Sequence, residues 1–225
     1  MKTVFVILAG LILLSSCTGN KRGTPDARPA KSDSVAGTRG AEPVKNDTVT
    51  DADYSFDEAI AGTGAPQNII DQLELFDVLY LSCDGKIHRG QILSGKKIAE
   101  DIRTIFRFML AEGFVVEKAI PAVRYGWSDS LSMADNNSYS FCYRDITYSK
   151  HATGMAIDIN PRFNPLRWKT GNRPSQPEGA SSDSTVNGTL YPGHPVVNEF
   201  VRLGFRWGHS FSKFYDDHHF EKVVR

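Results

Sequence analysis

The segment 149–160 combines an imidazole, a carboxylate and small residues in a spacing that suits chemistry. His151 lies seven residues before Asp158, and Gly154 stands between them where a turn is needed. If residues 155–160 form a strand, their apolar side chains face the core and Asp158 points to the opposite, accessible face. The spacing therefore predicts that His151 and Asp158 converge on one point.

A second group of reactive side chains occupies residues 215–221, close to the C-terminus, and includes the adjacent His218 and His219. One of these imidazoles, together with His151 and Asp158, would make a set of two histidines and one carboxylate. Such a set is typical of a hydrolytic zinc site with an open fourth position. A further acid nearby could take the proton from the water. From spacing alone, ordinary surface pairs between histidines and acids are an equal alternative. The carboxylates of this group are Asp216, Asp217 and Glu221.

Four motifs taken together resemble the zinc D,D-/L,D-peptidases of family M15. They are Phe-x-x-Arg at 141–144, Ser-x-His-x₂-Gly-x-Ala-x-Asp-Ile from Ser149, Trp-Gly at 207–208, and Asp-x-x-His-Phe-Glu from Asp216. The likeness extends back to about Lys86, and it is strongest to the carboxypeptidase-like subgroup, which carries the Phe-x-x-Arg motif. The family includes D-alanyl-D-alanine carboxypeptidases, dipeptidases and L-alanyl-D-glutamate endopeptidases.

The resemblance implies a role for each matching residue. The zinc ligands would be His151, Asp158 and His219, and the catalytic acid would be Asp216, three residues before the last ligand. A ligand one residue earlier would put a tyrosine in the place of the acid, and a tyrosine is a poor base near neutral pH. If residues 215–221 form a strand, His218 faces away from the zinc site.

The resemblance also gives functions to Arg144 and Ser149. The Arg144 guanidinium would bind a substrate carboxylate or the negative charge that develops on the scissile carbonyl; a surface salt bridge is the alternative. Ser149 would hydrogen-bond a ligand or the substrate. The chain departs from the family at 207–211, where Trp-Gly-His-Ser-Phe replaces Trp-Gly-Gly-Asp-Trp. His209 could therefore contact substrate, but we expect it to be exposed to solvent.

Strands mixed with isolated helices predict an α+β fold with a small central antiparallel sheet flanked by helices. The resemblance implies the zinc-peptidase fold of the D-Ala-D-Ala peptidase type. The two remaining histidines, His88 and His194, are expected to be structural. The expected elements are a hairpin of strands 75–81 and 86–92 with its turn at Asp84-Gly85, a helix over 98–110 ending at Gly113, a strand at 114–116, and a helix over 195–203 with Pro195 in its first turn.

The N-terminal residues predict export and anchoring. Residues 1–16 form a signal peptide whose apolar run is too short to span a bilayer comfortably. The run ends in Leu-Ser-Ser before Cys17, which resembles a lipobox, so Cys17 is the expected lipidation site; an ordinary secretory signal is the alternative. Thr18 favours the outer membrane of a Gram-negative cell, facing the periplasm. Residues 17–52 form the expected flexible tether, because they hold too little apolar surface to fold, and 53–225 the peptidase domain.

The composition excludes several other classes of protein. The 225 residues carry 26 basic and 26 acidic side chains and are 40% hydrophobic, as in globular proteins. A net charge of zero argues against a nucleic-acid partner, which would require a basic excess. Besides Cys17, the chain has Cys83 and Cys142, too few for a disulfide scaffold. Two buried free thiols are slightly favoured over a disulfide.

The sequence therefore predicts a monomeric, lipid-anchored, zinc-dependent peptidase that hydrolyses a bond next to a D-amino acid in peptidoglycan stem peptides. D,D-carboxypeptidase and L,D- or L-Ala-D-Glu endopeptidase activities both remain open. The alternative is a lipoprotein that binds cell-wall peptide without cleaving it, although all four expected site positions are filled. A redox protein is disfavoured, because Cys83 and Cys142 do not form a Cys-x-x-Cys pair.

Overall fold

The computed structural model describes residues 48–146 and 148–223, and the folded unit starts earlier than the sequence indicated. Strand β1 (Val49–Thr50) pairs in parallel with β3 (Ile87–Gly95), and Ala52 is buried. The expected tether boundary at residue 52 is therefore wrong by a few residues. The amino-acid composition did not reveal β1. So short a strand is held by backbone hydrogen bonds to its neighbour, and these do not depend on the type of side chain. The signal peptide and Cys17 lie outside the described residues.

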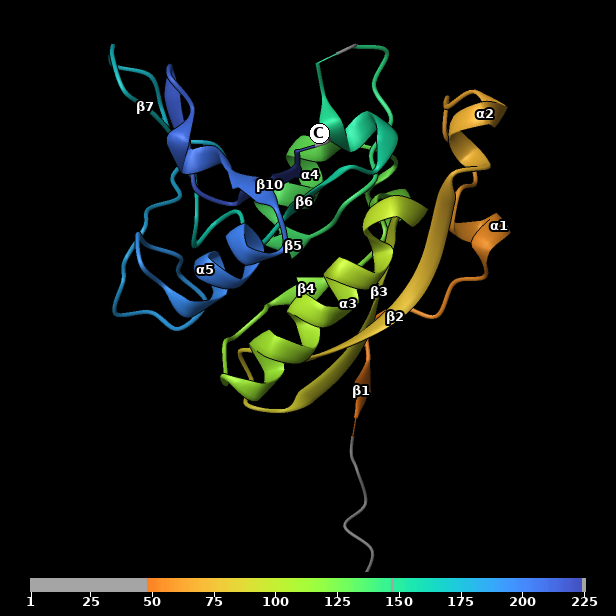
Figure 1. Ribbon diagram of the computed structural model, residues 1–225, viewed down its shortest axis with the longest axis horizontal. Coiled ribbons are helices and arrows are strands. Elements are labelled where there is room, and N and C mark those ends of the chain that lie inside the picture. The colour runs from red at the N-terminus through yellow and green to blue at the C-terminus, as the bar shows by residue number, and fades with distance from the viewer. Residues whose placement is uncertain (1–47, 147, 224–225) are drawn as a thin grey trace, which may run out of the picture. The chain divides into compact units, whose positions relative to one another are not determined.

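The predicted hairpin is present and precedes the longest helix of the described chain. Strand β2 (Leu73–Leu81) pairs antiparallel with β3 along its whole length, from Leu73 opposite Gly95 to Leu81 opposite Ile87. Gly85, with φ of 77°, lies in the connecting turn. Helix α3 (Lys96–Ala111) follows β3 directly and lies across the hairpin (Figure 1).

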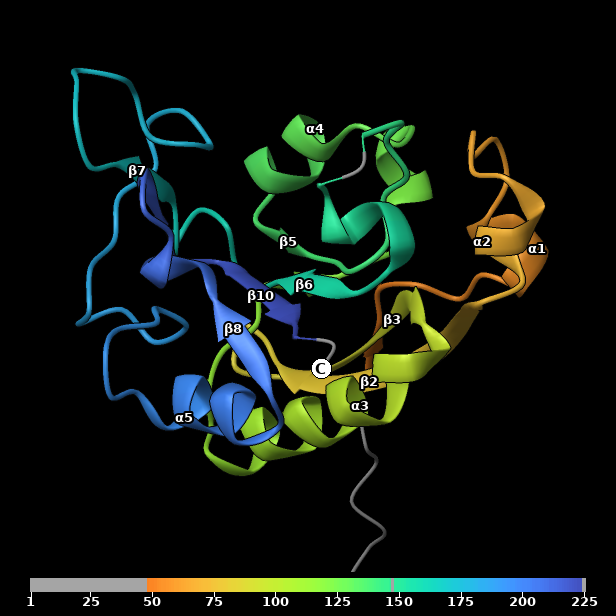
Figure 2. The same ribbon diagram turned by 45° about the horizontal axis from the view of Figure 1, so that its top comes forward.

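The main hydrophobic core lies where α3 and α5 (Pro195–Arg202) meet the strands, and Figure 2 shows the two helices side by side. Both helices were predicted, and Gly113, with φ of 66°, follows α3 as expected. The Nδ1 atom of His194 accepts a hydrogen bond from the backbone N–H of Val196 at 3.1 Å, so this histidine caps α5. The residues of α3 buried in the core recur at intervals of three and four positions and so share one face of the helix: Ile98, Ala99, Ile102, Ile105, Phe106 and Met109.

The α+β class is confirmed, but the described residues form four small sheets in place of one central sheet. The strands after α3 are two to four residues long, so each pairing ends after a few residues and loops separate the sheets. Residues 114–116 make only an isolated bridge, between Val115 and Leu81. The other sheets are β6 (Ala156–Asp158), β10 (His219–Lys222) and β8 (Phe205–Trp207), all antiparallel; β4 (Lys118–Ala119) parallel to β5 (Asn137–Ser138); and β7 (Leu166–Trp168) antiparallel to β9 (Phe214–Asp216).

The other helices are short. Ser55 and Glu58 form a capping box at the start of α1 (Phe56–Ala59). Among the helices of the described ranges, none has the length and apolar character needed to cross a bilayer. The remaining helical segments are α2 (Gln67–Ile70), α4 (Asp129–Ala134), and the 3₁₀ turns η1 (Ala122–Tyr125), η2 (Lys150–Thr153) and η3 (Gly208–Ser210).

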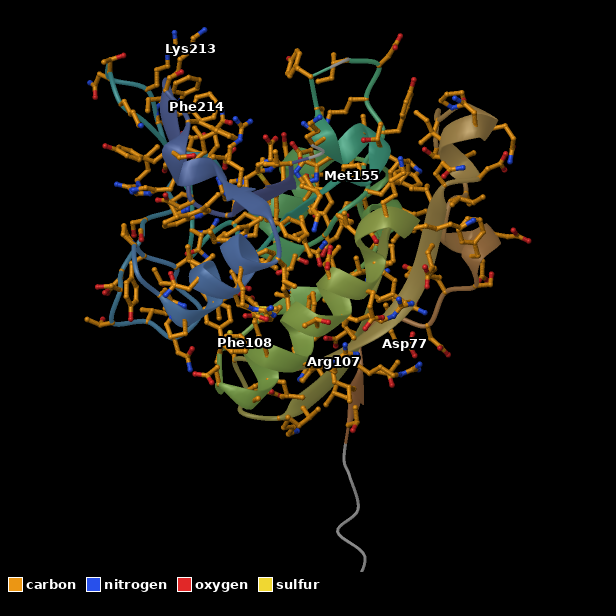
Figure 3. The ribbon with its side chains drawn as sticks, viewed as in Figure 1. Asp77, Arg107, Phe108, Met155, Lys213 and Phe214 are labelled. Carbon is orange, nitrogen blue, oxygen red and sulfur yellow. The ribbon has the colours of Figure 1, made fainter. Side chains whose placement is uncertain are left out.

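The sheet β6-β10-β8 separates the core from the residues that could do chemistry. Ile157 of β6 and Phe220 of β10 are fully buried in the main core, and Phe220 stacks on Phe200 of α5 at 3.7 Å between ring centroids. Because side chains alternate along a strand, Asp158 and His219 point to the opposite face. Met155, which is labelled in Figure 3, precedes β6, and its partly buried side chain packs against the main core.

Candidate metal centre

Three side chains from distant parts of the sequence bring their ligand atoms to one place. Nε2 of His151 lies 3.1 Å from Oδ1 of Asp158 and 3.0 Å from Nδ1 of His219. The third side of this triangle, from Nδ1 of His219 to Oδ1 of Asp158, is 3.0 Å. All three residues are buried, so the arrangement is not a chance pairing of mobile surface groups. The structure brings together the three residues that the sequence proposed as ligands.

Local structure explains this convergence. Asp158 ends β6 and His219 begins β10, and the two residues are directly opposite each other in the antiparallel register. His151 comes from η2, which ends at Gly154 with φ of 64°. A Cβ atom on Gly154 would lie 2.4 Å from the backbone nitrogen of Gly95, so only glycine lets this turn pack against the end of β3.

Hydrogen bonds on the far side of each imidazole orient the two histidines. Nδ1 of His151 lies 2.6 Å from the carbonyl oxygen of Ser140, and Nε2 of His219 lies 3.4 Å from Oε2 of Glu221. If these nitrogens carry the protons, the lone pairs of the other two nitrogens point toward Asp158. Such outer partners are typical of metal-binding histidines. Two imidazoles and one carboxylate, held in this way, fit a catalytic zinc ion that keeps one position open.

Electrostatics in the cluster favour positive charge. Burial alone would raise the pKa of Asp158, but the facing imidazoles hold it well below its usual range. Burial lowers the pKa of His219, whereas hydrogen bonds to Asp158 and Glu221 raise it to about 9. Burial raises the pKa of Glu221, but its bonds to His219 and Arg206 lower it to about 2. A divalent cation would take the place of the proton that these carboxylates attract to His219.

His218 does not face away from the site, and the strand-based prediction for it is wrong. Its Nε2 atom lies 3.0 Å from Oδ1 of Asp216 and 3.8 Å from Oδ2 of Asp158. The reason is that residues 217–218 form a turn between β9 and β10, so strand alternation does not apply to them. Burial lowers the pKa of His218, but the charges of Asp216 and Asp158 raise it to about 10.

Asp216, the expected catalytic acid, ends β9 beside the three ligands. It lines the same cleft as His151, Asp158 and His219, and its Oδ1 atom is buried. The close packing of η3 fixes this position, because a Cβ atom on Gly208 would lie 2.8 Å from Cβ of Asp216.

Arg144 also reaches the cleft and is held by two partners that the sequence did not indicate. Its Nη2 atom lies 3.0 Å from Oδ1 of Asp129 and 3.3 Å from the hydroxyl of Tyr139. The Tyr139 ring stacks on His151 at 5.1 Å between centroids, and its hydroxyl donates to Asp129. Burial lowers the pKa of Arg144, but Tyr139 and Asp129 raise it above its usual value. Ser149 lies on the cleft wall at the start of η2.

His209 is partly exposed to solvent, with 29% of its side chain accessible, and it is not among the residues that line the cleft. Its Nδ1 atom lies 2.6 Å from Oδ1 of Asp217, a carboxylate that is almost fully buried. Arg167 of β7 donates to the other oxygen of Asp217 at 2.7 Å. Asp217 therefore ties η3 and β7 to the turn that carries His218. The sequence did not indicate this role, because Arg167 lies 50 positions before Asp217 and no motif joins the two.

The cleft around the ligands has a volume of about 790 Å³ and is open to solvent. One wall includes Arg144, Ser149 and Lys150. The other comes from the strands β8 and β9 and their connection, with Arg206, Phe211 and Lys213. Figure 3 shows Lys213 and Phe214 at the projecting end of β9. The size of the cleft suits a short peptide, and both walls carry cationic groups that could meet carboxylates.

A family model described as D-alanyl-D-alanine carboxypeptidase, from the M15 peptidases, matches residues 144–222. No curated protein and no solved structure matches the chain. The matched segment begins at Arg144 and contains all three candidate ligands and Asp216. Over this segment the chain is similar to the M15 peptidases, and the match supports membership of that family.

Proposed function

We propose that this protein is a zinc-dependent peptidoglycan peptidase, which hydrolyses a bond next to a D-amino acid in stem peptides. The observation that carries the proposal is the buried triangle of ligand atoms from His151, Asp158 and His219. It lies at an open cleft in a segment that matches a carboxypeptidase family. The activity would be that of a D,D-carboxypeptidase or that of an L,D- or L-Ala-D-Glu endopeptidase.

In this proposal a zinc ion held by the three ligands would polarise the scissile carbonyl and lower the pKa of a water molecule. Asp216 accepts a proton from the attacking water as its oxygen bonds to the carbonyl carbon. When the carbon–nitrogen bond breaks, Asp216 gives this proton to the leaving amine. Asp216 thus ends the cycle in its starting state.

Arg144 binds the charge that the substrate carries or develops. A guanidinium can hold a peptide carboxylate with two parallel hydrogen bonds, or stabilise the oxyanion of the tetrahedral state. The pairing of Arg144 with Asp129 and Tyr139 supports this role, because it orients the guanidinium before substrate arrives. Ser149 donates a further hydrogen bond to the substrate from the same wall.

We further propose that the protein acts as a monomer, anchored by a lipid on Cys17 to the outer membrane and facing the periplasm. Its partners would be stem peptides and the membrane, with no role for nucleic acid. The tether before residue 49 would let the peptidase domain reach the cell wall from the membrane.

Substitution of Asp216 tests the proposal. Asp216→Asn should retain zinc, because the three ligands are untouched, while hydrolysis of purified stem peptides falls by about 10²–10⁴-fold. Mass spectrometry of the digests measures the rate and identifies the bond that is cut. A wild-type protein that cleaves no stem peptide would overturn the function. Full activity in Asp216→Asn would overturn the role of this residue.

A further inference from the structure

His218 is buried between the candidate catalytic acid and a rigid part of the fold. Its Nε2 atom lies 3.0 Å from Oδ1 of Asp216. Within the described residues, this buried oxygen has no regular hydrogen-bond partner, and the one side chain that forms an ion pair with it is His218. On the other side of the ring, Nδ1 donates to the carbonyl oxygen of Asn164 at 2.8 Å. The imidazole thus connects Asp216 to Asn164.

Asn164 is itself immobilised by several hydrogen bonds. Its amide nitrogen donates to the carbonyl oxygens of Ile159 at 3.0 Å and of Gly188 at 3.0 Å, and its side-chain oxygen accepts from the backbone N–H of Leu190 at 2.6 Å. The residue is completely buried. The Asn164 carbonyl oxygen that accepts the hydrogen bond from Nδ1 of His218 is therefore held in one position. This hydrogen bond orients the imidazole.

We propose that His218 is a positioning residue for hydrolysis, holding the Asp216 carboxylate in the orientation from which it exchanges its proton. This inference rests on the proposed function, in which Asp216 handles the proton. The two residues between Asp216 and His219 then have separate tasks. Asp217, although buried, points away from the ligands' neighbour Asp216 to its partners His209 and Arg167 and ties the turn to η3 and β7, whereas His218 contacts the acid.

Two amide substitutions separate the two contacts of the imidazole. The amide nitrogen of an asparagine falls near the place of Nδ1, and that of a glutamine near the place of Nε2. His218→Asn can therefore keep the bond to Asn164 and lose the contact with Asp216. His218→Gln can do the reverse, leaving a buried carbonyl without its donor.

If His218 positions Asp216, the variant with the higher melting temperature should be the one with the lower kcat. His218→Gln should have the lower melting temperature but keep kcat within about threefold of wild type. His218→Asn should be the more stable of the two, while its kcat falls by about 10-fold to 100-fold, because small misplacements of a reacting group have effects of this size. KM for a stem peptide and zinc content per chain should stay unchanged in both. As a control, His194→Ala removes the cap of α5 and should lower the melting temperature without changing kcat.

A double-mutant cycle provides a second measurement. In an Asp216→Asn background, His218→Asn should cause no further fall in kcat, because its effect passes through the missing carboxylate. Two results would overturn the role of His218. One is that kcat and melting temperature rank the two variants in the same order, so that His218→Asn is at least as active as His218→Gln. The other is additive effects in the cycle.

The cycle also separates this inference from the proposed function. If the wild type does not hydrolyse stem peptides, or Asp216→Asn is fully active, the proposed function fails, and the role of His218 fails with it. If Asp216→Asn is inactive with zinc bound but the His218 variants show either result above, only the positioning role fails.

Discussion

Gly208 is a position at which one added methyl group should press directly on the candidate catalytic acid. A Cβ atom there would lie 2.7 Å from the carbonyl oxygen of Asp216, 2.8 Å from Cβ of Asp216 and 3.2 Å from Cβ of His219. Carbon atoms in contact are usually at least about 3.5 Å apart, so Asp216 must move by roughly half an ångström or more. Such overpacking typically costs about 1–3 kcal/mol of stability. Because a shift of about 1 Å can reduce catalysis about 10²-fold, we expect Gly208→Ala to lose at least about tenfold in kcat.

The assay compares kcat on a purified stem peptide with the melting temperature and zinc content of the same preparation. Gly64→Ala is the matched control, since the nearest atom to its Cβ would be a Tyr143 ring carbon at an ordinary 3.8 Å. Gly64→Ala should keep wild-type activity and stability. A Gly208→Ala protein with wild-type kcat and melting temperature would refute the reasoning, because the added methyl group would then not have displaced Asp216.

Three further predictions concern the anchor, a histidine outside the site, and the thiols. Cys17→Ser should move the protein from the membrane to the soluble fraction, as cell fractionation would show, since lipid on Cys17 is the proposed anchor. Burial lowers the pKa of His88, but hydrogen bonds to two aspartates raise it above its usual value. Its stabilising effect should therefore be complete below about pH 6.5 and be lost as pH rises through the higher folded-state pKa. The melting temperature of wild type should accordingly exceed that of His88→Gln by more at pH 5.5 than at pH 9, and an equal difference would contradict this. A maleimide should label the exposed Cys83 in the native protein, whereas the buried Cys142 should react only after unfolding; native labelling of both would contradict the fold around Cys142.

The spacing of apolar residues and the turn residues along the sequence were sufficient to predict the long elements. The apolar spacing of α3 and the Asp84-Gly85 turn of the hairpin are local signals, and both elements form as predicted. The buried face of β6 also followed from alternation, since Ile157 faces the core and Asp158 the cleft. These features depend on residues close together in the sequence.

The short strands could not be predicted in the same way. Pairing of β7 with β9 joins residues almost 50 positions apart, and each strand has three residues, too few for a periodic pattern. Val49 and Thr50 join the sheet through backbone hydrogen bonds, although they follow a segment with the composition of a flexible linker. One central sheet was therefore expected where the described residues form several small ones.

At the site, spacing and family likeness identified the residues but not their surroundings. His218 was misplaced because the strand was assumed to continue through a turn. Asp129 and Asn164 have no motif of their own, and their importance comes from distant partners, Arg144 and the backbone of Gly188. Such contacts depend on the tertiary fold, which the sequence pattern around each residue does not record.

The central claim is that His151, Asp158 and His219 hold one zinc ion. Elemental mass spectrometry of the purified protein tests it most directly, with His151→Ala as the variant and His88→Ala as a control outside the site. We predict about one zinc per chain in the wild type and in His88→Ala, and little in His151→Ala, because two ligands bind zinc weakly. A wild type that takes up no zinc, or a His151→Ala protein with a full equivalent, would contradict the account.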